Sequence, residues 1–202
     1  MKPHQSNFQI CTFTLCQSFI LSSLDKADER RYLLQEKLSG SSIPLSSVPN
    51  GEKIVACLLE LVKEFDNRVS QLPTMTVSLV SNSKHDSVQD SYIEVLDGVL
   101  DSKNWGRIVA VFAFLRMLAL ELVKRGREDE VVMLIELTSS YCTEQLRSWI
   151  TSHGGWSALL YFVHSEPIED NSALCVLWKI RDAFVSVVNT TCQIFESLTD
   201  FA

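Results

Sequence analysis

The sequence predicts an all-helical, single-domain protein. It has 202 residues, enough to bury one sizeable core, and only seven glycines and five prolines, few for a sheet protein with many tight turns. Hydrophobic residues make up 46% of the chain and charged residues 21%, a balance that excludes a disordered chain. Long stretches rich in Leu, Val, Glu and Lys favour helix.

The first fifty residues predict two helices and a loop. Apolar residues recur at helical spacing from Phe8 to Ile20 and indicate an amphipathic helix that ends in the charged run from Asp25 to Arg31. A short second helix is expected from Arg30 to Leu38. The Ser-, Pro- and Gly-rich stretch Gly40 to Gly51 predicts a loop that is too short to separate two domains.

Two further helices are expected before the middle of the chain. Apolar residues at intervals of three and four predict an amphipathic helix from Ile54 to Val69 that is broken before Pro73. The polar stretch Ser81 to Ser91 is expected to be a loop, followed by a short helix from Tyr92 to Leu100.

The most hydrophobic part of the chain predicts a central helical hairpin. Within a helix expected from Asn104 to Lys124, residues Ile108 to Leu115 are apolar on every side and therefore need partners all round. Gly126 is expected to cap this helix at its C-terminal end, and a second long helix is expected from Val131 to Trp149.

The remaining sequence predicts two more helical stretches. His153-Gly154-Gly155 interrupts the pattern, a short helix is expected from Trp156 to Val163, and a last one from Ala173 to Leu198. We therefore expect a single domain over 1–202, with an N-terminal helical region (1–38), a loop (39–53), a core (54–163) and a C-terminal helical tail (164–202).

Several functional classes are disfavoured by the composition. The net charge of −7 opposes the phosphate attraction on which nucleic-acid binding depends. The four histidines are far apart and the six cysteines form no C-x-x-C pair, so we expect no metal and free, buried thiols. No sequence signature of an enzyme or of a cofactor site is present, and we expect neither.

Three stretches are apolar enough to be compared with membrane segments: Phe8 to Leu24, Ile108 to Val123 and Leu174 to Phe195. The first is interrupted by polar residues, and the other two contain charged side chains, which are costly at the centre of a bilayer. We therefore expect no transmembrane anchor, while membrane association stays open.

Arg107 is unusual because it lies in the first turn of the most hydrophobic helix, where the helix dipole opposes a cation. Asn104 can cap this helix, and Gly106 allows another backbone to approach closely. One interpretation is a docking point for an incoming acidic helix. The alternative is that Arg107 pairs with an internal carboxylate, Asp97 or Asp101, and that Gly106 only eases packing.

Two motifs resemble those of a known family. The sequence NWGRIVAVFAF, from Asn104 through Trp105 to Phe114, resembles the first homology motif of the Bcl-2 apoptosis regulators. Trp149-Ile150-Thr151-Ser152-His153-Gly154-Gly155-Trp156 resembles the second homology motif, at the expected distance downstream. The resemblance extends over about Ile54 to Val163.

The resemblance implies a bundle of about eight helices around a central hydrophobic hairpin, with a surface groove for the amphipathic death-motif (Bcl-2 homology 3) helix of pro-apoptotic partners. Arg107 would pair with an aspartate of that helix, while Asn104 and Gly106 would contact its backbone. The apolar positions expected along the groove, each of which could equally be an ordinary core residue, are Phe65, Val69, Leu72, Leu96, Val99, Leu100, Val109, Ala110 and Phe114.

The chain also departs from the family pattern. Death-promoting members carry a Leu, three residues and then Gly-Asp in the third motif, whereas here Leu58 is followed after three residues by Val62-Lys63. Lys63 would repel the groove arginine of another member, which favours the receptor role over the ligand role. The two small residues that often follow the first motif are replaced by Leu115 and Arg116.

The resemblance thus implies an inhibitor of apoptosis that sequesters pro-apoptotic Bcl-2 proteins in the cytoplasm, with association with the mitochondrial outer membrane and homodimerisation left open. Two alternatives are a pro-apoptotic pore-forming member of the same fold and a helical scaffold with an occluded groove.

Overall fold

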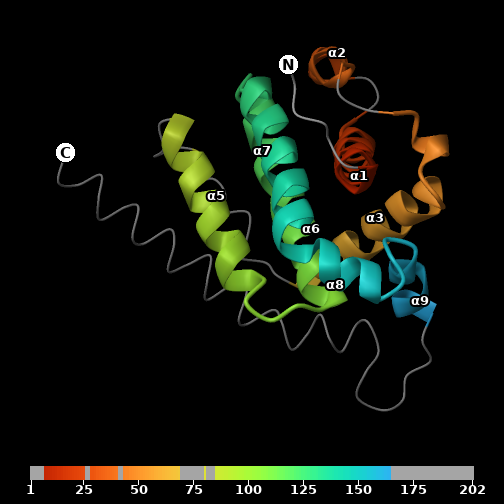
Figure 1. The fold of residues 1–202 in the computed structure, drawn as a ribbon. Coiled ribbons are helices and arrows are strands. Elements are labelled where there is room, and N and C mark those ends of the chain that lie inside the picture. The colour runs from red at the N-terminus through yellow and green to blue at the C-terminus, as the bar shows by residue number, and fades with distance from the viewer. Residues whose placement is uncertain (1–6, 26–27, 41–42, 69–79, 81–84, 165–202) are drawn as a thin grey trace.

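The computed structural model (Figure 1) describes residues 7–25, 28–40, 43–68, 80 and 85–164, and their regular secondary structure is entirely helical. The elements are α1 (Asn7–Ser23), α2 (Glu29–Leu38), the short 3-10 helix η1 (Leu45–Ser47), α3 (Gly51–Arg68), α5 (His85–Val99), α6 (Trp105–Lys124), α7 (Glu128–Tyr141), the π-helical turn η2 (Cys142–Leu146), α8 (Arg147–Ser152) and α9 (Ala158–His164). The predicted all-helical bundle of about eight helices is confirmed.

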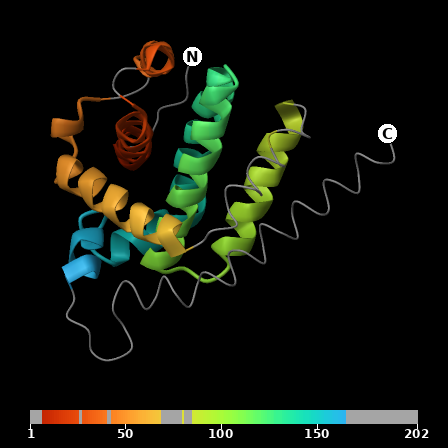
Figure 2. The same ribbon diagram turned by 180° about the vertical axis from the view of Figure 1, so that it is seen from behind.

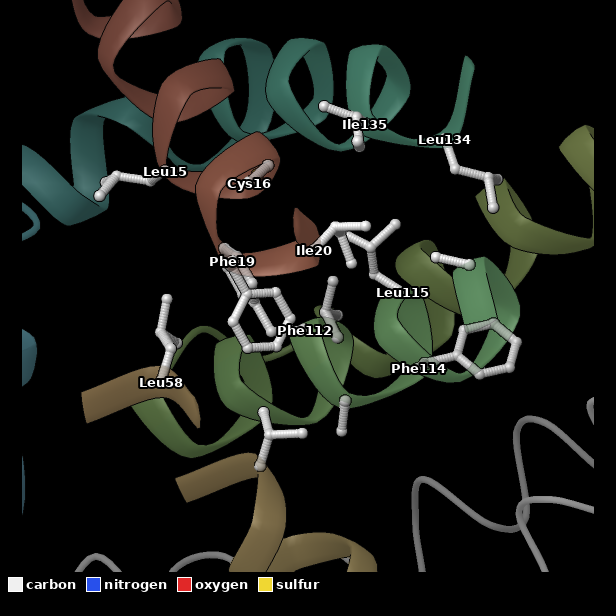
Figure 3. Close-up of a cluster of buried hydrophobic side chains, with 14 of the residues drawn as sticks. Leu15, Cys16, Phe19, Ile20, Leu58, Phe112, Phe114, Leu115, Leu134 and Ile135 are labelled. Atoms are coloured by element: carbon white, nitrogen blue, oxygen red, sulfur yellow. The ribbon is translucent and has the colours of Figure 1, made fainter. Parts of the chain in front are cut away.

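Helix α6 is the centre of the bundle. All eight side chains from Ile108 to Leu115 are buried, which confirms that this stretch has partners all round. Phe112 lies edge-on to Phe19 of α1, with ring centroids 5.4 Å apart, whereas Phe114 points away from α1 (Figure 3). Phe114 stacks instead on Tyr92 of α5, at 5.9 Å.

The other helices surround the hairpin of α6 and α7. Helix α1 packs against α3, α6 and α7, and α5 packs against both helices of the hairpin. Helices α3 and α5 lie on opposite sides of the hairpin in both views (Figures 1 and 2). This arrangement leaves α6 with packing partners from α1, α3, α5 and α7.

Helix α1 is buried on more sides than its predicted amphipathic pattern implies. Consecutive residues from Thr12 to Cys16 are all buried. The two threonines among them have partners, because the Thr12 hydroxyl donates to the Phe8 carbonyl (2.9 Å) and that of Thr14 accepts from the Ile43 amide (3.3 Å). The polar residues that interrupt this apolar stretch therefore serve the interior of the bundle.

The predicted loop from Ser81 to Ser91 is wrong over its second half, where α5 already runs from His85. Val88 and Ser91 are buried. Val88, Tyr92, Val95 and Val99 repeat at helical intervals, so the apolar stripe of α5 begins one turn before the first residue of the predicted helix. The polar composition between these positions concealed that stripe.

Glycines end two of the helices. Gly126, at φ 71°, follows α6: its amide donates to the Val123 carbonyl and the Arg127 amide to the Leu122 carbonyl, each at 3.0 Å. This pair of bonds is the Schellman motif and confirms the predicted cap. Gly154 and Gly155, also at positive φ, form the same arrangement after α8, which confirms the predicted interruption.

The second helix of the hairpin begins at Glu128, three residues before its predicted start, and contains a π-helical turn, Cys142–Leu146, that the sequence did not indicate. The Thr138 and Thr143 hydroxyls bond to the carbonyls four residues earlier, at 2.7 and 2.8 Å. Such bonds compete with the backbone ladder and bend helices, which favours an irregular turn here.

None of the helices in the described ranges is long and apolar enough to cross a membrane. The helix expected from Ala173 to Leu198 lies outside the described residues.

Candidate functional site

The site begins at the N-terminus of α6. Asn104 has an extended backbone, and its side-chain oxygen accepts a hydrogen bond from the Arg107 amide at 2.9 Å, which confirms the predicted cap. Gly106 is buried in the first turn. Capping fixes where α6 starts and therefore fixes the direction in which the next side chain, Arg107, leaves the helix.

Arg107 reaches from α6 to the end of α5. Its half-buried guanidinium donates from Nη1 to the Val99 carbonyl at 2.6 Å. This carbonyl lies in the last turn of α5, where a cation is favoured by the helix dipole. This contact explains why a cation is tolerated at the N-terminus of α6. The dipole of α6 disfavours the cation there, whereas the C-terminus of α5 favours it.

The alternative pairing of Arg107 with Asp97 or Asp101 is not found. Asp97 instead accepts a hydrogen bond from the Tyr141 hydroxyl at 2.8 Å, and Asp101 is exposed. Among the residues described by the structure, no carboxylate forms an ion pair with Arg107. The guanidinium is therefore held by a main-chain carbonyl.

The described apolar positions expected along the groove lie on or directly after three helices, α3, α5 and α6. Phe65 is on α3, Leu96 and Val99 are on α5, and Leu100 directly follows α5. Val109, Ala110 and Phe114 are on α6, and all seven side chains are buried. Leu96 and Leu100 line a small interior space together with Ile108, Val111 and Phe112 of α6 and with residues of α7 and η2. Val69 and Leu72 lie outside the described residues.

The two homology motifs meet in space through their tryptophans. Trp105 from the first motif contacts Trp149 and Trp156 from the second, with ring centroids 5.3 and 6.1 Å apart. Trp156 also contacts Phe112 of α6 at 6.1 Å and Phe8 of α1 at 6.3 Å. The motif residues thus form an aromatic cluster that joins α1, α6 and α8 beside the start of α6.

A buried hydrogen bond fixes this cluster to α1. The indole Nε1 of Trp156 donates to the Thr12 hydroxyl at 3.0 Å. Gly154 and Gly155 allow the chain to turn sharply just before Trp156, because both adopt positive φ. The glycines and tryptophans of the second motif therefore have structural roles: they place α8 and α9 against the rest of the bundle.

The third-motif segment lies on α3. Leu58 and Val62 are buried, whereas Lys63 is exposed. One turn further on, Asp66 accepts a hydrogen bond from Nη1 of Arg116 at 2.6 Å, within an ion pair between α3 and α6. From the sequence, Arg116 is notable as a charge inside an apolar stretch and as a departure from the family pattern. Its pairing with a residue fifty positions away could not be predicted from spacing.

The described residues offer little for catalysis. No group of His, Cys, Asp and Glu in the described ranges could hold a metal ion. The four described cysteines are free, and burial raises the pKa of the Cys57 thiol to about 11 and that of Cys142 to about 12, so both stay protonated at neutral pH. Chemically, the site offers a charged donor, Arg107, beside apolar surface.

Comparisons with known proteins agree with this arrangement. Residues 57–156 match the family model described as "Apoptosis regulator proteins, Bcl-2 family". A crystal structure of schistosome BCL-2 bound to ABT-737 is 40% identical, with a TM-score of 0.66, and the match covers 78% of this chain and 98% of that one. Chicken BOK has the same fold at 18% identity and a TM-score of 0.60, covering 79% of this chain and 98% of that one.

Curated relatives match over shorter regions. The apoptosis regulator R11 of Xenopus laevis is 30% identical over 110 residues, which are 54% of this chain and 53% of that protein. The anti-apoptotic protein NR13 of Gallus gallus is 34% identical over 74 residues, 35% of this chain and 42% of that protein. The chain therefore spans about half the length of these relatives, or less.

Proposed function

Because this chain belongs to the Bcl-2 family of apoptosis regulators, we propose that it is a pro-survival member that binds the death-motif helix of pro-apoptotic relatives. Its mechanism is competition: a bound death-motif helix cannot act elsewhere. Binding would take place between α3, α5 and α6, with Arg107 as the charged anchor, and no chemical step is involved.

The observation that carries the proposal is the state of Arg107. Its guanidinium is half-buried and is held by the Val99 carbonyl, and no described carboxylate neutralises it. A ligand carboxylate that reaches this cation would form a charge-assisted bond in a partly desolvated setting, which is stronger than one at an exposed surface. An aspartate on an incoming helix fits this requirement.

The third-motif segment and one relative support the receptor role. Lys63 is exposed on α3 where a death-promoting member carries an acid, so this helix would present a cation to another groove arginine. NR13, a relative at 34% identity, is named an anti-apoptotic protein. Action in the cytoplasm and at the mitochondrial outer membrane is part of the same proposal.

The test is isothermal titration calorimetry with death-motif peptides of about 25 residues, a length that covers several helical turns. We expect wild-type protein to bind at least one peptide with nanomolar Kd, and Arg107→Ala to weaken binding by roughly thirtyfold or more, since removing one partner of a desolvated charge pair costs about 2–5 kcal/mol. Arg147→Ala, which removes an exposed arginine from α8, is the matched control and should leave the affinity unchanged.

A double-mutant cycle separates the charge pair from a structural effect of Arg107. The peptide aspartate is replaced by alanine, and both peptides are titrated into wild-type protein and Arg107→Ala. If the two side chains pair, the second substitution costs little once the first is present. Additive losses, in proteins with unchanged circular dichroism, would show that Arg107 acts only through the Val99 carbonyl.

A closed groove is the second candidate, because the seven described groove positions are all buried. A scaffold of this kind would bind no peptide in the titration while remaining folded.

Liposome dye release after addition of a death-motif peptide tests the pore-forming alternative: the proposed pro-survival protein should release no dye.

A further inference from the structure

Helix α2 buries few of its side chains, and it contacts the C-terminal ends of α1 and α6. Of its ten residues only Leu34 and Leu38 are buried, and the large side chains of Tyr32 and Leu33 are exposed. Its start is fixed by Asp28, whose carboxylate accepts a hydrogen bond from the Arg30 amide at 2.9 Å. A ten-residue helix is marginal in isolation, so α2 depends on contacts with its neighbours.

Two neighbouring arginines of α2 bond to the C-terminal ends of two other helices. Nη1 of Arg30 donates to the Val123 carbonyl in the last turn of α6. Nε of Arg31 donates to the Leu21 carbonyl in the last turn of α1, at 3.0 Å. Each cation therefore lies where the helix dipole is negative. The Val123 carbonyl accepts both from Arg30 and from the Gly126 amide of the α6–α7 turn.

A third cation of α2 reaches the start of α7. Nζ of Lys37 lies 2.6 Å from Oδ1 of Asp129, in the acidic first turn of α7. Both side chains are well exposed, so this pair alone contributes little to stability. Together with Arg30, however, it connects α2 to both helices that meet at the α6–α7 turn.

The same turn has a further polar contact with another part of the chain. Nη1 of Arg127 donates to the Val80 carbonyl at 2.9 Å, and Arg127 also forms a two-point ion pair with Glu130. The turn is thus fixed to the bundle by polar contacts with α2 and by the bond of Arg127 to Val80.

We infer that α2 is a detachable clasp that holds the α6–α7 turn and the end of α1, and that its docking sets how readily this end of the hairpin opens. The polar contacts that fasten it are with two main-chain carbonyls and one exposed carboxylate, and they add to the buried side chains of Leu34 and Leu38; all of these contacts are lost together when α2 undocks. The inference concerns conformational control of the hairpin and does not depend on the proposed function.

Amide hydrogen exchange on the full chain tests this directly. We expect Arg30→Ala to speed exchange of the amides from Leu122 to Arg127 roughly tenfold or more, since a hydrogen bond from a charged donor is stronger than a neutral one. Tyr32→Ala, which truncates an exposed side chain of the same helix, is the matched control and should leave these amides unchanged. Amides from Phe112 to Leu115 report on global opening and should not change in either variant.

The clasp is refuted if exchange from Leu122 to Arg127 is the same in wild type and Arg30→Ala. It is equally refuted if exchange rises by the same factor in the central stretch of α6, because that pattern means a general loss of stability. If Arg30→Ala does not fold, Arg30→Lys is followed instead: it keeps the charge but loses the planar fork, and a smaller acceleration confined to the turn is expected.

Discussion

Asp66 carries a carboxylate into the interface between α3 and α6, where its two oxygens have different surroundings. Oδ2 pairs with Arg116 at 2.6 Å, whereas Oδ1 is buried and has no hydrogen-bond partner among the described residues. Burial raises the pKa of Asp66, and the Arg116 guanidinium opposes this shift without cancelling it. The ionised carboxylate of Asp66 is therefore less favourable in the folded protein than in water, because the cost of desolvation outweighs the single ion pair.

This raised pKa predicts a pH dependence with a definite sign. Between the ordinary aspartate pKa and the raised one, the folded state binds more protons than the unfolded state, so the contribution of Asp66 to the free energy of unfolding is fully present at lower pH and is lost as pH rises through this window. Urea unfolding at several pH values should show wild type losing stability relative to Asp66→Asn across the window. A difference between the two proteins that is constant with pH, or that grows in favour of wild type, would contradict the burial argument.

At the scale of elements, the bundle depends on how its helices end. Gly126 lies at φ 71°, and a Cβ built on it would meet nothing within 4 Å. Glycine is therefore favoured here by the left-handed backbone and not by lack of space for a side chain. The turn it forms leads directly from α6 into α7, with Arg125 at the end of α6 and Arg127 just before α7. The geometry of the hairpin therefore rests on one residue that tolerates the left-handed region.

Gly126→Ala should lower the free energy of unfolding by about 1 kcal/mol, because alanine is strained at positive φ. Gly40→Ala is the matched control: its Cβ would also meet nothing within 4 Å, but its backbone is not left-handed. Urea denaturation followed by circular dichroism measures both. Equal effects of the two substitutions would mean that the left-handed conformation of the turn is not what Gly126 contributes.

The elements differ in how far the sequence predicts them. Helix α6 is predictable because the stretch Ile108 to Leu115 is apolar on every side. The caps at Asn104 and Gly126 are predictable because asparagine is favoured before the first turn of a helix and glycine in the left-handed position after the last turn. The start of α5 is not, since polar residues separate Val88 from the rest of its stripe. The π-helical turn depends on backbone competition that composition does not reveal.

Long-range polar contacts at the candidate site were also beyond prediction. Spacing identified Arg107 as unusual, but its bond to the Val99 carbonyl depends on how α5 and α6 cross. The same holds for the pair of Asp66 and Arg116 and for the arginines of α2, whose partners lie on helices distant in the sequence. The sequence could identify unusual charged residues, whereas the partners of these residues could be identified only from the fold.

At the scale of the whole molecule, one core joins the N-terminal helix to both homology motifs. Phe19 of α1 packs on Phe112 of α6, and Phe112 contacts Trp156 of the second motif. Trp156 returns to α1 through the hydroxyl of Thr12. These contacts connect α1 both to α6 and to the second motif. The described bundle, including α1, should therefore unfold as a unit.

Cooperativity can be tested with the tryptophans, because Trp105, Trp149 and Trp156 form one cluster, whereas Trp178 lies outside the described residues. In a Trp178→Phe background, urea transitions followed by tryptophan fluorescence and by far-ultraviolet circular dichroism should have the same midpoint. Phe19→Leu, far from the motifs in sequence, should lower the free energy of unfolding by about 1 kcal/mol and shift both transitions equally, because the loss of packing at Phe112 is felt throughout the core. If the fluorescence transition stayed in place while the circular dichroism transition moved, α1 would fold independently of the motif cluster, and the contacts of Trp156 with α1 would contribute little to the stability of the bundle.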